Sequence, residues 1–204
     1  MGNFNTIFNE LTTELAKLPG IGRRSAERIA FHIMKTPAAQ AALLARKIEE
    51  ITKLVKPCQL CNNFSTADIC SICSNPQREK DTICVVEEPK DILAIEKTAH
   101  YSGLYYVLLE SISPLEGVSE EDMDISRLIE RLRSGTIREV IIATNPDTEG
   151  ELTAQFLIEK ISAFKVKLYR IAIGIPMGTQ IEYIDSSTLG KALKDKKEVV
   201  SDPG

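Results

Sequence analysis

The acids of the turn ATNPDTEGE, residues 143–151, are the part of the chain best suited to chemistry. This turn follows one short apolar run, and Glu87 closes an earlier one. Because the carboxyl ends of neighbouring parallel strands converge on one crevice, Glu87, Asp147 and Glu151 could meet there. Carboxylate ligands of this kind suit Mg²⁺ in phosphoryl-transfer sites. The simpler alternative is a helix N-terminus that carries acids, which the helix dipole favours without any metal.

Four of the five cysteines form a second cluster, with the spacing Cys-x2-Cys-x8-Cys-x2-Cys. Two such knuckles supply the tetrahedral all-sulfur ligand set that Zn²⁺ prefers, and four protein ligands leave no open position for a reacting water. We therefore predict one structural zinc ion and a reducing compartment, rather than a disulfide framework. Two separate redox pairs, or unliganded buried thiols, fit this spacing less well. The predicted ligands are Cys58, Cys61, Cys70 and Cys73.

The stretch LPGIGRRSAERIA, residues 18–30, is a glycine turn rich in arginine. It fails as a dinucleotide fingerprint, because Ser25 stands where a third glycine is needed and a helical pattern precedes it. It fits a helix-hairpin-helix, in which glycines let the backbone approach a phosphate and the next helix aims its free N–H groups there. Such a motif binds phosphates without reading bases. The alternative is an ordinary helix-ending Pro-Gly turn. The candidate DNA contacts are Gly20, Ile21, Gly22, Arg23, Arg24 and Arg28.

The spacing of apolar residues predicts the elements that hold these groups. Residues 4–18 are predicted to form a helix, a second helix begins with Ser25 as its N-cap, and a third follows Pro37. The first 57 residues are thus predicted to be helical. Beyond them, β-rich runs at 82–87, 104–110, 138–144 and 165–172 alternate with helical patterns at 90–100, 122–134 and 149–162.

This alternation predicts an α/β fold with a mainly parallel sheet covered on both faces. Near the end, QIEYID (180–185) is predicted to be a last strand and SSTLGKALKD (186–195) a short helix. The segment KKEVVSDPG, residues 196–204, is predicted to be a loose or partner-seeking tail.

Charge is distributed unevenly along the 204 residues, whose formal net charge is −4. Through Pro57 there are 9 Lys/Arg against 5 Asp/Glu, and from Cys58 onward there are 16 against 24. The basic N-terminal part is therefore the candidate for phosphate contact. No run of about 18 apolar residues and no signal-peptide pattern is present, so we expect a cytoplasmic protein.

The acidic turn resembles the Toprim domain shared by topoisomerases, bacterial primases and some nucleases. The active Toprim pattern reads D-P-D-x-E-G-E, and this chain has Asn145 at its first position, followed by Asp147, Glu149 and Glu151. An amide can still donate an oxygen to a metal, yet it brings no charge, so affinity for Mg²⁺ should fall. The resemblance thus implies a vestigial or weak magnesium site that could instead bind a partner.

The order of parts resembles the RecR family of bacterial recombination mediators. A helix-hairpin-helix, four zinc cysteines, a Toprim domain and a C-terminal segment with GIPMG and EYID follow one another, and the segments VVEEPKDILAIEKT and SISPLEGV add to the likeness. The resemblance implies a helical domain at 1–56, a four-cysteine zinc finger at 57–79, a Toprim domain at 80–173 and a C-terminal oligomerisation segment at 174–204.

This resemblance implies a non-catalytic DNA-binding scaffold of recombinational repair. Such proteins act with RecO, and in some systems RecF, on gapped or single-stranded DNA coated with SSB, and they help to load RecA. The resemblance also implies dimers or ring-like tetramers and a cytoplasmic, nucleoid-associated location. Clustering of the basic parts in a ring would let a net-negative protomer bind DNA in a salt-sensitive way.

Several positions depart from the family pattern. Leu109 and Glu110 replace a usual pair of glycines, Tyr106 stands where His is frequent, and Ile173 stands where Arg is usual. Thr179-Gln180 alters a glycine-containing turn, and Asp147 restores an acid that the family usually lacks.

Two other interpretations remain. One is a Mg²⁺-dependent Toprim nuclease or primase-like enzyme, which gains from Asp147 and loses from Asn145. The other is a zinc-stabilised interaction module that never touches DNA. Salt-sensitive DNA binding, lost on changing Arg23 and Arg24, would separate the scaffold from this last interpretation.

Overall fold

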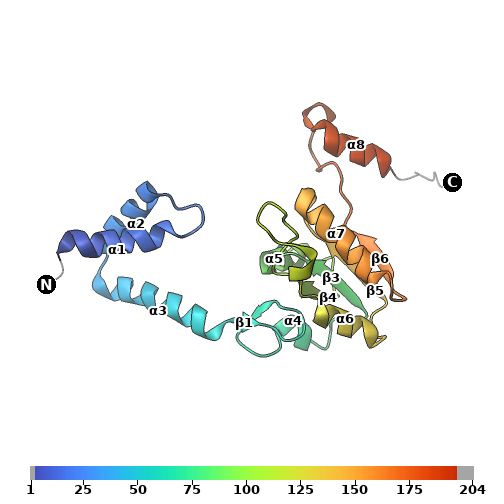
Figure 1. The fold of residues 1–204 in the computed structure, drawn as a ribbon, viewed down its shortest axis with the longest axis horizontal. Coiled ribbons are helices and arrows are strands. Elements are labelled where there is room, and N and C mark those ends of the chain that lie inside the picture. The colour runs from blue at the N-terminus through green and yellow to red at the C-terminus, as the bar shows by residue number, and fades with distance from the viewer. Residues whose placement is uncertain (1–2, 197–204) are drawn as a thin grey trace. The chain divides into compact units, whose positions relative to one another are not determined.

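The computed structural model describes residues 3–196, which form parts of two compact units, Met1–Val55 and Lys56–Gly204 (Figure 1). The described part of the first unit is helical, and that of the second contains both helices and strands. Among the described residues, no helix combines the length and the apolar character needed to cross a membrane.

The described part of the first unit contains three helices. They are α1 (Phe4–Ala16), α2 (Arg23–Lys35) and α3 (Ala38–Leu54). The helices α1 and α2 pack together through the rings of Phe8 and Phe31, whose centroids lie 4.6 Å apart, and through the fully buried Ala26 and Ala30. Three helices were predicted here, and the structure confirms them.

The predicted start of α2 is wrong by one turn. The N-cap is Gly22, and Ser25 lies inside the helix, because the Gly22 carbonyl already accepts the first helical hydrogen bond from the Ala26 N–H at 3.0 Å. Ser25 was predicted because serine is a favoured N-cap. In the structure the turn ends earlier, and the helix already begins with Gly22 as its N-cap. The prediction that all of the first 57 residues are helical is also wrong at its end, where Lys56–Pro57 form a strand.

The second unit begins with a small hairpin and a parallel sheet. Strands β1 (Lys56–Pro57) and β2 (Phe64–Ser65) pair antiparallel, and the short helix α4 (Ser71–Ser74) follows them. The sheet has the order β4-β3-β5-β6, and every neighbouring pair is parallel. Its strands are β3 (Thr82–Val86), β4 (Leu104–Val107), β5 (Glu139–Ala143) and β6 (Lys167–Arg170).

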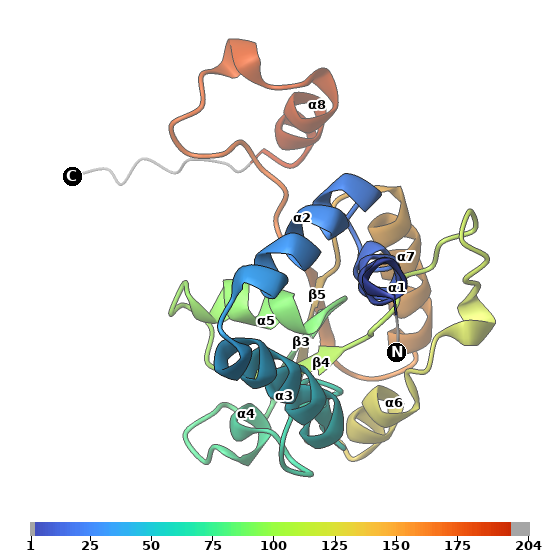
Figure 2. The same ribbon diagram turned by 90° about the vertical axis from the view of Figure 1, so that its left-hand side faces the viewer.

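Helices cover both faces of this sheet, as predicted (Figure 2). They are α5 (Pro89–Glu96), α6 (Ser126–Arg133) and α7 (Thr148–Ile161). On one face Val85 and Tyr106 pack with Leu128 of α6 and Leu157 of α7, and all four are fully buried. The opposite face buries Cys84, Val86 and Tyr105 against Ile92 of α5. Burial on both faces explains why β3 and β4 are near-continuous apolar runs, whereas the residues of β6 alternate between exposed and half-buried.

The C-terminal strand prediction is wrong. Within QIEYID, Ile181–Tyr183 form a 3₁₀ turn, and Ile181 and Tyr183 are 65% and 75% exposed. The alternating apolar residues predicted a strand, but in the described part of the chain no strand pairs with them. The following helix, α8 (Ser186–Lys194), is confirmed and begins where Asp185 accepts a 2.8 Å hydrogen bond from the Thr188 N–H. The predicted tail lies, from residue 197, outside the described residues.

Candidate functional site

The four cysteines converge on one point, as their spacing predicted. Their sulfur atoms all lie within 4.8 Å of one another, and the Sγ atoms of Cys61 and Cys70 are 3.6 Å apart. Cys58, Cys61 and Cys70 are at most 3% exposed, and Cys73 is half-buried. Across residues 3–196 this is the one cluster of three or more side chains with metal-ligating atoms so close together.

The electrostatics of the cluster call for a cation. Burial opposes ionisation of Cys58, but backbone N–H groups lower the pKa of its thiol to about 7, and the Cys70 N–H lies 3.3 Å from its sulfur. The pKa of Cys61 is raised by its hydrogen bond with the Cys73 side chain and then by burial, and burial raises the pKa of Cys70. Four thiolates cannot share this space without a positive ion.

The ligand set fits zinc. Four sulfur donors in two Cys-x-x-Cys knuckles match the closed tetrahedral sites of structural Zn²⁺, and such an ion deprotonates the thiols that bind it. The segment has almost no apolar core apart from the cysteines themselves and Ile72. Zinc binding would therefore supply the folding free energy that this segment lacks.

The glycine turn joins α1 and α2 in a conformation that leaves its backbone open. Gly20 has φ +76°, a left-handed conformation that favours glycine. Gly22 has an ordinary extended backbone, and a Cβ atom there would meet nothing within 4 Å. Neither backbone strain nor packing within the chain therefore requires glycine at position 22. The first N–H groups of α2 have no side-chain cap from Gly22.

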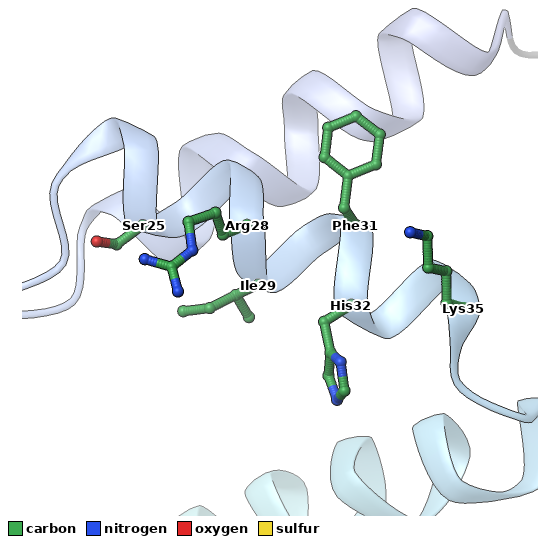
Figure 3. A pocket seen from close by; sticks show the side chains of 6 residues that line it. All are labelled: Ser25, Arg28, Ile29, Phe31, His32 and Lys35. Atoms are coloured by element: carbon green, nitrogen blue, oxygen red, sulfur yellow. The ribbon is translucent and has the colours of Figure 1, made fainter.

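The arginines of α2 are exposed. Arg23 lies 3.4 Å from the carboxylate of Glu27, whereas Arg24 and Arg28 make no ion pair with any residue between 3 and 196. Figure 3 shows Arg28 beside Ser25 at the start of the helix, with His32 and Lys35 further along it. These residues line a shallow surface hollow. Arg24 and Arg28 lie in the first two turns of α2, so their guanidinium groups can reach a ligand at the helix N-terminus.

At the carboxyl end of the sheet, Glu87 and Asn145 lie in direct contact. Glu87 directly follows β3 and is 5% exposed. Its carboxylate accepts a hydrogen bond from the Asn145 backbone N–H at 3.2 Å and another from the Asn145 side-chain amide. Burial raises the pKa of Glu87, although the Asn145 backbone N–H partly opposes this. The amide therefore takes a place beside Glu87 that a cation would take in an acidic site.

The other acids of this turn have separate partners. Asp147 is the N-cap of α7 and accepts a 2.8 Å hydrogen bond from the Gly150 N–H, while Glu149 accepts one from Ser113. Glu151 lies 3.1 Å from Lys191 of α8 and 3.3 Å from Arg170 of β6. The structure brings Glu87 and Asn145 together and does not gather the acids around one point.

Two features of this turn escaped sequence reasoning. Gly150 is required sterically, because a Cβ there would lie 2.1 Å from the Asn145 carbonyl oxygen. Arg170 donates hydrogen bonds to the carbonyls of Ile142, Thr144 and Asn145 at 2.8 to 3.2 Å. Arg170 lies in the predicted β-rich run 165–172 and is the last residue of β6, but nothing local in the sequence indicates which carbonyls it reaches.

Comparisons with known proteins match the chain along nearly its whole length. The matching family models describe the RecR helix-hairpin-helix (residues 8–52), the RecR zinc finger domain with four cysteines (55–75), the Toprim domain (81–172) and the RecR C-terminal region (174–197). Recombination protein RecR of Tropheryma whipplei (strain TW08/27) is 47% identical over 193 residues, which cover 95% of this chain and 98% of that protein. Recombination protein RecR of Koribacter versatilis is 45% identical over 199 residues, which cover 98% and 100% respectively.

Proposed function

Because this chain belongs to the RecR family, a family of recombination-repair scaffolds and not of enzymes, we propose that it binds DNA phosphates through the glycine turn and α2. We further propose that it acts with RecO and RecF on SSB-coated gapped or single-stranded DNA to load RecA. The segments 1–56, 57–79, 80–173 and 174–204 would respectively bind DNA, hold zinc, meet partners and assemble copies of the chain.

The observation that carries the DNA-binding proposal is the open N-terminus of α2. The extended backbone conformation of Gly22 is open to any residue, and a Cβ atom there would meet no other atom within 4 Å. Nothing within the described chain therefore requires glycine at this position. A close-approaching external group explains it, since a Cβ would stand between that group and the helix N–H donors. Arg24 and Arg28 add exposed cations near these donors. Backbone N–H donors and arginines together suit a phosphate and carry no base sequence information.

Oligomer formation is supported by an exposed apolar stripe on α3. This helix has no buried residue, and five large apolar side chains on it are each 50% to 60% exposed. Such a stripe is unfavourable in water unless another surface covers it. A second copy of the chain would cover it in the dimer or tetrameric ring that we propose. The residues are Leu43, Leu44, Ile48, Ile51 and Leu54.

The carboxyl end of the sheet is proposed as a partner surface. Asp147 is exposed, and Glu149 and Glu151 are half-buried, so this edge presents negative charge to solvent. Acids arranged in this way steer the association of a basic partner such as RecO. A weak Mg²⁺ contact at Glu87 and Asp147 is proposed only as a remnant, because Asn145 already donates to Glu87.

The test measures DNA binding and, in the same sample, whether the DNA strands stay intact. Zinc-loaded protein is mixed with end-labelled gapped duplex and Mg²⁺ and run on native and denaturing gels at two salt concentrations. We expect a salt-sensitive shift with intact strands. The variant R24Q/R28Q should bind more weakly, with a slope of log K against log salt smaller by about one for each lost phosphate contact.

Arg46→Gln is the matched control, because Arg46 is an exposed arginine of α3 without an ion pair in the described part of the chain. Equal loss of binding in R46Q and R24Q/R28Q would contradict the assignment of α2. Cleaved strands that persist through purification and vanish in D147N would contradict the non-catalytic function.

A further inference from the structure

Two arginines of α6 reach the backbone of the first zinc knuckle. Nη1 of Arg127 lies 3.4 Å from the Cys58 carbonyl oxygen and donates a 2.7 Å hydrogen bond to the Asn62 side chain. One helical turn later, Nη1 of Arg131 lies 3.5 Å from the Leu60 carbonyl oxygen. The knuckle is thus held by cationic donors from a helix more than 60 residues away in sequence.

The same knuckle is joined to the edge of the parallel sheet. The Val107 N–H of β4 donates to the Cys61 carbonyl at 2.8 Å, and the Asn62 amide donates back to the Val107 carbonyl at 3.0 Å. Arg131 also donates to the Tyr105 carbonyl of β4 at 3.1 Å. Since β4 is the outer strand of the sheet, the knuckle and Arg131 satisfy backbone groups that would otherwise be unpaired.

The charges of the arginines and of the metal centre are complementary. Four thiolates and one Zn²⁺ carry a formal charge of −2, and two guanidinium groups carry +2. Neither Arg127 nor Arg131 forms an ion pair within 4.0 Å in residues 3–196. The pKa of the nearby Asp124 carboxyl is lowered mainly by hydrogen bonds from Ser126, and the charge of Arg127 contributes less. Both positive charges therefore remain available to the zinc centre.

We propose that Arg127 and Arg131 are positioning residues of the zinc centre. They hold the carbonyls of the first knuckle so that Cys58 and Cys61 face the metal, and their charge stabilises the anionic tetrathiolate. Through the same contacts they join zinc binding to α6 and to the edge of β4. Groups that orient metal ligands from outside the ligand set typically change metal affinity about 10- to 100-fold when mutated.

The test measures zinc affinity in the full-length protein by competition with a chromogenic chelator. We expect R127Q and R131Q each to weaken zinc binding by about tenfold, and the double variant by more. Arg133→Gln is the control, because Arg133 is an exposed arginine of the same helix that makes no hydrogen bond or ion pair with the zinc finger in residues 3–196. Zinc affinities of R127Q and R131Q equal to that of R133Q would overturn the proposal.

A second measurement separates the effect of the arginine charge on zinc binding from a general loss of protein stability. R131K keeps the charge, so it should retain more zinc affinity than R131Q, and the gap should shrink as salt screens the charge. Cobalt substituted for zinc should show an altered absorption spectrum in R127Q/R131Q if the ligands are no longer held in place. The proposed role would be contradicted by two results together: a cobalt spectrum in R127Q/R131Q that equals that of the wild type, and equal zinc affinities of R131K and R131Q at every salt concentration. This holds even if the variants are less stable than the wild type.

Discussion

Asn145 donates two hydrogen bonds to the buried carboxylate of Glu87, one from its backbone and one from its side-chain amide. An aspartate at position 145, as in the active Toprim pattern, could not donate from its ionised side chain. The amide therefore satisfies Glu87 without a metal ion. From this pair of residues we expect the sheet to keep its carboxyl-end acid without needing Mg²⁺ for stability.

Replacing Asn145 by aspartate should make stability depend on magnesium. N145D puts a second carboxylate against Glu87, which raises the pKa of Glu87 further and removes a donor from a buried charge. We expect a loss of about 1–3 kcal/mol in the free energy of unfolding without divalent ions, with part of it recovered in Mg²⁺. Urea denaturation with and without Mg²⁺ measures both. N145A is the control, because it loses the amide without adding charge and should not respond to Mg²⁺.

Glu87 should give the protein a characteristic pH dependence. Burial raises its pKa in the folded state above the unfolded value of about 4.3. Its contribution to stability is therefore fully present below that unfolded value and is lost as pH rises through the folded pKa. Relative to E87Q, the wild type should lose stability between about pH 4 and the raised pKa, and denaturation curves across this range measure the difference.

The contribution of Glu151 to stability should depend on pH in the opposite direction to that of Glu87. Its hydrogen bond with Lys191, and then the nearby Arg170 charge, lower its pKa despite some burial. Its contribution is present above the unfolded pKa and is lost as pH falls through the folded value. Because this pair is exposed by more than a third, E151Q should change stability by less than about 1 kcal/mol. A pH profile of the same sign for E87Q and E151Q would refute the two assignments.

Leu109 should be a strained position that glycine relieves. Its φ is +70°, in the left-handed region, at one of the two positions where the family resemblance implies glycine. This conformation costs a non-glycine residue about 1–2 kcal/mol, partly offset in L109G by the greater entropy of the unfolded chain. We expect L109G to raise the free energy of unfolding by up to about 1 kcal/mol. E110G is the control, because Glu110 has no positive φ, and it should be neutral or destabilising.

Gly22→Ser should separate folding from DNA binding. The added Cβ meets open space, and serine is a good N-cap, so α2 should be as stable as before or slightly more stable. The new side chain occupies the approach to the helix N–H groups, so gapped duplex should bind more weakly in a salt titration. Gly20→Ser, by contrast, meets φ +76° and should cost about 1 kcal/mol of stability. Unchanged DNA affinity in G22S would argue against phosphate contact at the turn.

Zinc removal should loosen one edge of the sheet before its centre. The Val107 N–H donates to the Cys61 carbonyl, and this bond depends on the shape of the knuckle. After chelation, hydrogen exchange at Val107 should speed up strongly, whereas the N–H groups of β5, paired on both sides, should keep their protection. Equal acceleration at both strands would mean that the metal stabilises the whole unit and not its edge.

Much of this architecture follows from local patterns. The four parallel strands were predictable because their runs are rich in β-forming residues, and β3 and β4, buried on both faces, are almost wholly apolar. The helices between them carry apolar residues at helical spacing. The zinc cluster was predictable because its ligands come as two short knuckles. In each of these cases the information lies within a few residues of the chain.

One miss is local, at the start of α2, and the others concern relations between residues far apart in the chain. Ser25 is not the N-cap because the preceding turn fixes where α2 begins, and QIEYID is not a strand because no described strand pairs with it. The contacts of Arg127, Arg131 and Arg170 join elements far apart in sequence.

The sequence alone thus determined the chemistry available to this protein: four sulfur ligands, an open glycine turn with cations, and an amide among acids. The tertiary structure alone decided which partner each acid meets, because β3 and β5 are neighbours and place Asn145 against Glu87 while Glu151 lies near Arg170 and Lys191. The physical reason is the distance along the chain over which each effect acts. Side-chain type and periodicity act locally, whereas hydrogen bonding and charge depend on distances that only the packed chain defines.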